Sequence, residues 1–308
     1  MSEEIKPIKS FEDKSWKDFI EKCKKQVDTD NSDRLYDDGT KNFVEKFNAT
    51  ATFLDYSKIC CNPKYILVGI EPSSPQDGAE TSPRDGVETV SFPLFLHYCA
   101  WKYLCGEKFD YYITDFAKGA MPTAAANDKD SQKARYPKWL PLFEQEWKLL
   151  GQPEIILMGK YFYGYRDEDN NKLRLGYRKD GKLERTLSSC DIRNGNFIYH
   201  YTTDRTTALK AEYDYISKKF GNLDGYKFKE TELTNFKDEL KKHLNGKYKV
   251  CDRYYDNLLN ESLKKTHWKD KVFPLYSYYF KLLSEKSHKD EFKDKFGKNI
   301  IPHKPSEA

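Results

Sequence analysis

The feature that most constrains the fold is an alternation of short apolar runs with helical patterns. Residues 65–70 (Tyr-Ile-Leu-Val-Gly-Ile), 111–114 (Tyr-Tyr-Ile-Thr) and 154–159 (Glu-Ile-Ile-Leu-Met-Gly) are typical of strands buried on both faces. Apolar residues at helical spacing lie between these runs, over 92–104 and 137–150. The alternation of strand and helix predicts a parallel sheet with right-handed crossovers.

Further elements are predicted on both sides of this alternation. Apolar spacing favours helices over 11–27 and after Thr40. Residues 179–182 (Lys-Asp-Gly-Lys) and 193–196 (Arg-Asn-Gly-Asn) are typical of hairpin turns, and the second precedes a strand at 197–200. We therefore predict an α/β fold of three layers, α/β/α, with a central parallel sheet and a helical C-terminal extension.

Composition and charge divide the chain into three predicted segments. We expect an N-terminal helical segment at 1–58, an α/β core at 59–209 and a basic, aromatic-rich helical extension at 210–308. This extension contains 22 Lys and Arg against 16 Asp and Glu, whereas residues 1–209 contain 31 against 33. Its aromatic side chains need burial, so we expect it to pack on the core. The excess of positive charge is compatible with a polyanionic partner, but charge alone favours a solvated Lys-rich helical surface.

Several classes of protein are disfavoured by composition. Aromatic residues make up 15% of the chain, too large a share for a disordered protein. No apolar run is long enough to predict a membrane span, and the N-terminus is too charged for a signal peptide. The seven cysteines are scattered without a Cys-x-x-Cys pair. We expect a reduced intracellular, cytoplasmic protein without a structural metal or iron–sulfur cluster.

Three polar residues follow predicted strands and are therefore candidates for one site. Glu71 follows the first strand, Asp115 the second, and His200 the strand at 197–200. In open α/β sheets, ligands bind beyond the carboxyl ends of the strands. We expect the three loops to converge on one cleft.

Four short motifs occur in a suggestive order. They are Val-Gly-Ile-Glu-Pro-Ser at 68–73, Tyr-Ile-Thr-Asp-Phe-Ala-Lys at 112–118 continuing to Met-Pro-Thr at 121–123, a Gly-Lys-Tyr-Phe-Tyr turn at 159–163, and His-Tyr-Thr-Thr-Asp-Arg at 200–205. This order resembles the uracil-DNA glycosylase superfamily, and most closely its mismatch-specific uracil/thymine-DNA glycosylase branch. The resemblance covers about half of the chain and implies the three-layer fold of that superfamily.

The resemblance implies an enzyme that hydrolyses the N-glycosidic bond of a base flipped out of DNA and leaves an abasic site. It implies a monofunctional glycosylase that uses water as nucleophile, with DNA as partner and without cofactor or metal. DNA repair or antiviral defence is the expected role, defence resting on a modified cytosine as the base, and a monomer is expected although the sequence does not fix the oligomeric state. Glu71 takes the position of the Asp or Asn that orients water. His200 takes the position of the residue that stabilises the leaving base. Glu71 is one methylene longer than Asp, and Tyr201 replaces a proline.

Asp115 carries the prediction about the base. An ionised carboxylate only accepts hydrogen bonds, so it favours the amino group of cytosine over O4 of uracil. We therefore expect a pyrimidine such as a modified cytosine. A protonated Asp115 would instead imitate the Asn that reads uracil, and Asp115 could simply cap a turn. The resemblance places three further residues at the base: Phe92, for whose stacking role Phe95 and Leu96 compete, Ile70 and Thr202.

The resemblance also assigns contacts to the DNA backbone. Ser73, Lys118, Lys160 and Arg205 are the candidates. Two other functions stay open. One is a non-catalytic nucleic-acid or nucleotide binder that keeps the fold, and the other is an interaction protein whose helices in 210–308 bind another protein.

Overall fold

The structure is a computed structural model that describes residues 5–33, 41–48, 50–53, 59–71, 73–74, 93–126, 128–158, 172–173, 176–179, 182–186, 192–193, 197–198, 213–214, 217–218, 223–244 and 268–285. Its helices are α1 (Lys14–Ser32), α2 (Phe43–Phe47), α3 (Leu94–Cys99), η1 (Ala100–Leu104), α4 (Thr123–Ala126), α5 (Lys129–Leu149), η4 (Leu223–Tyr226), α7 (Glu230–Leu244), η5 (Trp268–Val272) and α9 (Phe273–Ser284). Its strands are β1 (Thr52–Phe53), β2 (Tyr65–Gly69), β3 (Ser73–Ser74), β4 (Tyr111–Asp115), β5 (Gly119–Pro122), β6 (Glu154–Met158), β7 (Lys172–Leu173), β8 (Gly176–Lys179), β9 (Lys182–Thr186), β10 (Ile192–Arg193) and β11 (Phe197–Ile198).

The main sheet is parallel and has the strand order β11-β6-β2-β4. Strand β2 pairs with β4 on one side, with Tyr65 opposite Tyr111, and with β6 on the other, with Tyr65 opposite Glu154. Strand β11 extends the sheet next to β6. Every residue of β2 and β4 is buried, as the continuous apolar runs predict. The predicted α/β class and parallel sheet are confirmed.

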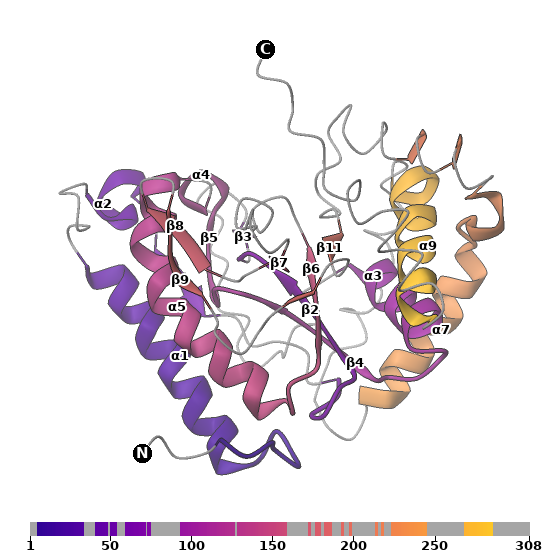
Figure 1. Cartoon of the computed structure of the whole chain (residues 1–308), viewed down its shortest axis with the longest axis horizontal. Coiled ribbons are helices and arrows are strands. Elements are labelled where there is room, and N and C mark those ends of the chain that lie inside the picture. The colour runs from indigo at the N-terminus through magenta and orange to yellow at the C-terminus, as the bar shows by residue number, and fades with distance from the viewer. Residues whose placement is uncertain are drawn as a thin grey trace.

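Helices lie on both sides of this sheet. Figure 1 shows α1 and α5 on one side and α3, α7 and α9 on the other. The chain passes from β2 through α3 to β4, and then from β4 through α5 back across the sheet to β6. Because the two crossovers run in opposite directions, right-handed connections put their helices on opposite faces.

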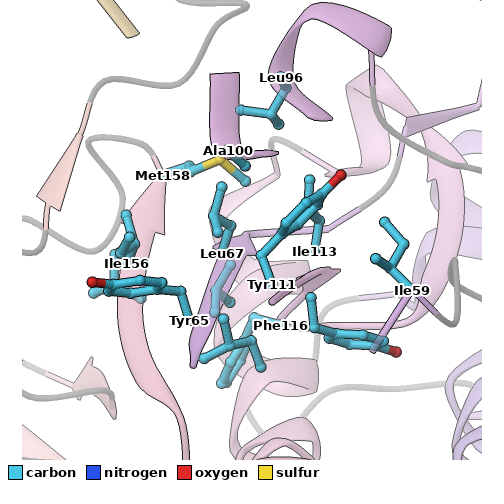
Figure 2. Packing of buried hydrophobic residues seen from close by; sticks show 14 of the residues in the cluster. Ile59, Tyr65, Leu67, Leu96, Ala100, Tyr111, Ile113, Phe116, Ile156 and Met158 are labelled. Carbon is cyan, nitrogen blue, oxygen red and sulfur yellow. The ribbon is translucent and has the colours of Figure 1, made fainter. Parts of the chain in front are cut away.

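The core joins the sheet to these helices. Figure 2 shows Leu67 of β2 near Ile113 and Met158, with Leu96 and Ala100 of the α3–η1 segment above them. All five side chains are at most 1% exposed. Apolar burial on this scale is the main favourable term in folding, so the sheet and the helices above it form one stable unit.

The described helices of the C-terminal region belong to the same core. Phe236 of α7 and Tyr276 of α9 are buried in the cluster that contains the sheet residues. Glu232 of α7 accepts hydrogen bonds from Tyr98 and Lys102 of the α3–η1 segment. The C-terminal helices are therefore packed on the α/β core, while the predicted boundaries at 58 and 209 stay predictions.

The largest difference from the sequence prediction concerns α5. It begins at Lys129 rather than at Pro137, and Pro137 and Pro141 lie inside it. Asp128 caps its N-terminus, since the Asp128 carboxylate accepts a hydrogen bond from the backbone N–H of Ser131 at 2.9 Å. Proline is favoured at a helix start, so the sequence predicts that the helix begins at Pro137. In the structure, buried side chains on both sides of Pro137 continue the helix through it.

Smaller differences occur elsewhere. The helix predicted after Thr40 is limited to α2, and Leu54, which it was expected to include, lies outside the described residues. The predicted helix at 92–104 is divided into α3 and the π-helical η1. The turn at 179–182 joins the antiparallel pair β8–β9 as predicted. Residues 193–196 do not join a hairpin, because β10 pairs with β7 and β11 pairs with β6.

Candidate functional site

The strand order locates a switch point between β2 and β6. From β2 the chain moves to β4 on one side, whereas from β6 it moves to β11 on the other. Adjacent parallel strands whose connections leave in opposite directions open a crevice at their carboxyl ends, where ligands bind in this class of sheet. The loop that leaves β2 at this point carries Ile70 and Glu71. The candidate site is therefore built around Glu71.

The loops after β2 and β4 are held together by the main chain. Gly69 lies opposite Asp115 in the sheet. Beyond it, the Phe116 N–H donates to the Gly69 carbonyl and the Ala117 N–H donates to the Ile70 carbonyl, both at 2.9 Å. These bonds place the segments of Glu71 and Asp115 side by side, as the sequence predicts for two of the three loops.

Glu71 forms a buried ion pair with Arg135 of α5. Arg135 Nη1 lies 2.9 Å from Glu71 Oε2, and Nη2 lies 3.4 Å from Oε1. The side chains of Glu71 and Arg135 are 3% and 1% exposed. The guanidinium thus binds both carboxylate oxygens, the strongest arrangement for this pair of groups.

Arg135 is itself fixed by its neighbours. Its Nε donates to Ser131 Oγ at 2.9 Å. Its guanidinium carbon lies 5.7 Å from the ring centre of Phe43 and 5.5 Å from that of Tyr136. A hydroxyl and two aromatic rings leave the guanidinium little freedom to turn away from Glu71.

A second carboxylate, Asp30 of α1, shares this environment. Asp30 is buried and accepts hydrogen bonds from Trp139 Nε1 at 2.9 Å and from Gln26 Nε2 at 2.8 Å. Burial raises the pKa of Asp30, and the positive charge of Arg135 opposes that rise. Asp30, Arg135 and Glu71 are therefore one electrostatic cluster, which we name the Arg135 cluster.

The pKa of Glu71 reflects this cluster. Burial raises it above its ordinary value, and the charge and hydrogen bonds of Arg135 oppose the rise. The nearby charge of Asp30 raises it further. Arg135 is thus the largest of the influences that oppose the rise of the Glu71 pKa caused by burial.

Lys118 is buried in an ion pair with Glu146. It is 2% exposed, and its ammonium lies 2.7 Å from Glu146 Oε2 of α5. The same ammonium donates to Thr114 Oγ1 and to the Asp115 carbonyl. In this conformation the Lys118 ammonium is engaged inside the protein, and its contact with the DNA backbone stays a prediction.

The remaining predicted residues divide into two groups. Asp115 is 4% exposed at the end of β4, and Ile70 is partly buried against the core. The main chain of Ser73 belongs to β3, which pairs with β5. Five residues lie outside the described part of the chain: His200, Phe92, Thr202, Lys160 and Arg205. The structure therefore brings together the loops of Glu71 and Asp115.

Sequence reasoning missed Arg135 and Asp30. Arg135 lies in the turns of α5 that precede Pro137, where no helix was predicted. Asp30 lies on the buried face of α1, one turn after Val27. A charged residue at a core position of a helix is the signal that could have identified both.

Sequence comparison gives no relative. Searches against protein-family models and against curated protein sequences find no match to this chain. Among the described residues, no three His, Cys, Asp or Glu side chains form a group that could hold a metal ion. No helix in the described part of the chain is both long and apolar enough to cross a membrane.

Proposed function

We propose that this protein is a DNA glycosylase that releases a pyrimidine from DNA and leaves an abasic site. The observation that carries the proposal is the position of Glu71, a buried carboxylate at the switch point between β2 and β6, next to the Asp115 loop. The resemblance to uracil-DNA glycosylases places the group that orients water at this position. We propose the three-layer arrangement of that superfamily as the finer description of the fold.

The proposed reaction is a hydrolysis. The bond between C1′ of the sugar and the base nitrogen breaks, and its electron pair leaves with the base. The oxygen of water forms a bond to C1′, and its proton passes through solvent to the released base. Glu71 orients the water and stabilises the positive charge of the sugar, while His200 donates to the leaving base. Phe92, Ile70 and Thr202 complete the base pocket, and Ser73, Lys160 and Arg205 contact the DNA.

The proposed base is a cytosine, modified or unmodified. Asp115 lies beside the Glu71 loop, and an ionised Asp115 accepts a hydrogen bond from the amino group that distinguishes cytosine from uracil. Such an activity would serve DNA repair or defence against foreign DNA with modified bases.

A second function is favoured by one specific observation. Both oxygens of Glu71 are bound to Arg135, which partly neutralises the carboxylate. A carboxylate in this state suits a structural role, so we keep a non-catalytic nucleic-acid or nucleotide binder with this fold as the alternative.

The test is a base-release assay on purified protein. Duplex and single-stranded DNAs would carry uracil, a thymine mismatch, cytosine or a substituted cytosine, with free base measured by mass spectrometry and abasic sites by alkali cleavage. We expect release of one base, with Glu71→Gln and His200→Ala at least about a hundredfold slower. Glu21→Gln is the matched control, because Glu21 is a surface carboxylate, 61% exposed, on α1. DNA binding without release of any base by the wild type would favour the binder.

A further inference from the structure

We propose that Arg135 is the positioning residue of this site, because its guanidinium fixes the orientation of the Glu71 carboxylate and makes it a hydrogen-bond acceptor only. The inference rests on the proposed glycosylase function. The inference goes beyond that function because it names a residue of α5, outside all four sequence motifs, that determines which chemical role Glu71 can play.

The orientation follows from the contacts of Arg135. A guanidinium is planar, and its two terminal nitrogens match the two oxygens of a carboxylate. Here Nη1 and Nη2 reach Glu71 Oε2 and Oε1 at 2.9 and 3.4 Å. The third nitrogen, Nε, is bound to Ser131 Oγ. All three nitrogens are therefore engaged, and rotation of Glu71 would break two charged hydrogen bonds inside the protein.

The bonds to Arg135 leave Glu71 able to bind water. Each carboxylate oxygen has two lone pairs, and Arg135 occupies one on each oxygen. The other lone pair of each oxygen can accept a hydrogen bond from a water molecule. While both of its oxygens accept from Arg135, the Glu71 carboxylate acts only as an acceptor, so donation of a proton to the leaving base falls to another group such as His200.

The charge of the Arg135 cluster suits a positively charged sugar. Arg135 on α5, Glu71 after β2 and Asp30 on α1 meet there. The Tyr136 hydroxyl is a further titratable group, and Lys138 of α5 acts on Asp30 as a second, weaker positive charge. With both carboxylates ionised, the cluster carries a net charge of minus one. Arg135 therefore does not cancel the negative charge of the site, because it is shared between two carboxylates.

The experiment uses the full-length chain and two substitutions of Arg135. Arg135→Lys keeps the positive charge but provides only one nitrogen, and Arg135→Gln removes the charge. Lys148→Gln is the control, since Lys148 is on the same helix and its ion pair with Glu144 is at the surface. Carbon-13 labelling of glutamate side chains allows the Glu71 carboxyl to be titrated by NMR, with Glu71→Gln to assign its signal.

We expect the Glu71 titration to move to higher pH in Arg135→Gln and to stay near the wild-type position in Lys148→Gln. In base release, kcat should fall at least about tenfold in Arg135→Lys with KM changed less than threefold, because the carboxylate is misaligned but substrate binding is kept. The acidic limb of the pH–rate profile should move upward in Arg135→Gln. A merely structural Arg135 would change stability without moving this limb.

The outcomes separate the two proposals. An unchanged Glu71 titration in both Arg135 variants would overturn the positioning role, even if the wild type releases a base. If the Glu71 titration shifts in Arg135→Gln but the wild type releases no base, the coupling of Arg135 to Glu71 is upheld and the glycosylase is rejected. If Arg135→Gln does not fold, the kcat of Arg135→Lys decides: an unchanged kcat would overturn the positioning role, and a fall of at least about tenfold with little change in KM would support it.

Discussion

Lys118 and Glu146 form a second buried ion pair, with Lys118 Nζ 2.7 Å from Glu146 Oε2 and neither side chain more than 2% exposed. The arrangement parallels that of Glu71 and Arg135, because α5 supplies one partner in each pair. Arg135 binds the segment after β2, and Glu146 binds the segment after β4. Helix α5 therefore anchors both segments that carry the candidate site.

This relationship predicts a strong effect of breaking the Lys118 pair. Lys118→Met leaves the Glu146 carboxylate buried and unpaired, and should lower the free energy of unfolding by about 3–5 kcal/mol. The double variant Lys118→Met with Glu146→Leu should be less destabilised than Lys118→Met alone. Urea unfolding at pH 7 measures the free energy of unfolding of the single and the double variant. Lys24→Met, which breaks a surface pair with Glu21, is the control and should change stability by about 0.5 kcal/mol or less. A double variant as unstable as the sum of the single variants would contradict this account.

Asp115→Asn should change which base is released. An amide donates to O4 of uracil and accepts from N3–H, whereas an ionised carboxylate favours the cytosine amino group. We expect the ratio of kcat/KM for uracil to that for cytosine-type bases to rise at least about tenfold. A paired contact to a base edge discriminates against the wrong base by about 1–3 kcal/mol, which corresponds to such a change. Competition assays with both bases measure the ratio, with Asp18→Asn on the exposed face of α1 as control. An unchanged ratio would mean that Asp115 does not read the base.

His97 should make the fold sensitive to acid. It is fully buried in α3, with Nδ1 3.3 Å from the Tyr111 hydroxyl, and burial lowers its pKa to about 3. The unfolded chain binds a proton near pH 6.5, so between pH 6.5 and 3 it holds more protons than the folded chain. Stability should therefore fall as the pH decreases through this window, by an amount on the order of 5 kcal/mol at its lower end.

Unfolding measured from pH 7 to 4 in wild type and His97→Leu tests this expectation. The variant should lose less stability over the range, because it has no imidazole to protonate. Tyr111→Phe keeps the imidazole and removes its hydroxyl neighbour, so it should retain the wild-type pH dependence. Parallel curves for wild type and His97→Leu would show that other groups cause the acid sensitivity.

Glu232 should have the opposite kind of pH dependence from the buried carboxylates. Partial burial acts to raise its pKa, but hydrogen bonds from Lys102 and Tyr98 prevail and lower it to about 2. Its contribution to stability is therefore present above about pH 4.5 and is lost as the pH falls towards 2. Glu232→Gln should be less stable than wild type at pH 7 by about 1 kcal/mol or less, since the carboxylate is partly exposed, and equally stable at pH 2. Hydrogen exchange of α7 amides should show the same loss of stability in Glu232→Gln at pH 7. A stability difference between variant and wild type that persists at pH 2 would exclude the ionised carboxylate as its cause.

The sheet could be predicted because its strands are buried on both faces. Continuous apolar runs at 65–70, 111–114 and 154–159 lie within one residue of β2, β4 and β6. The positions of Glu71 and Asp115 after their strands follow from the same runs. Helix α5 was predicted less well, because Pro137 is a helix-start signal that the buried residues before it override.

The partners of the charged residues could not be predicted. Lys118 has the sequence context of an exposed loop residue, yet its ammonium is paired with a carboxylate 28 residues further along the chain. Nothing local distinguishes a lysine that reaches solvent from one that turns inwards to a helix packed on the sheet.

The sequence by itself therefore determined which segments become the central strands β2, β4 and β6, that these lie parallel, and that Glu71 and Asp115 follow β2 and β4. These properties depend on local apolar patterns and on the short reach of each connection. Only the tertiary structure decided the strand order, the switch point, and the binding of Glu71 to Arg135, 64 residues away. Which charges meet in the interior depends on how a helix crosses a sheet, and the side chains that meet there share no periodicity or spacing along the chain.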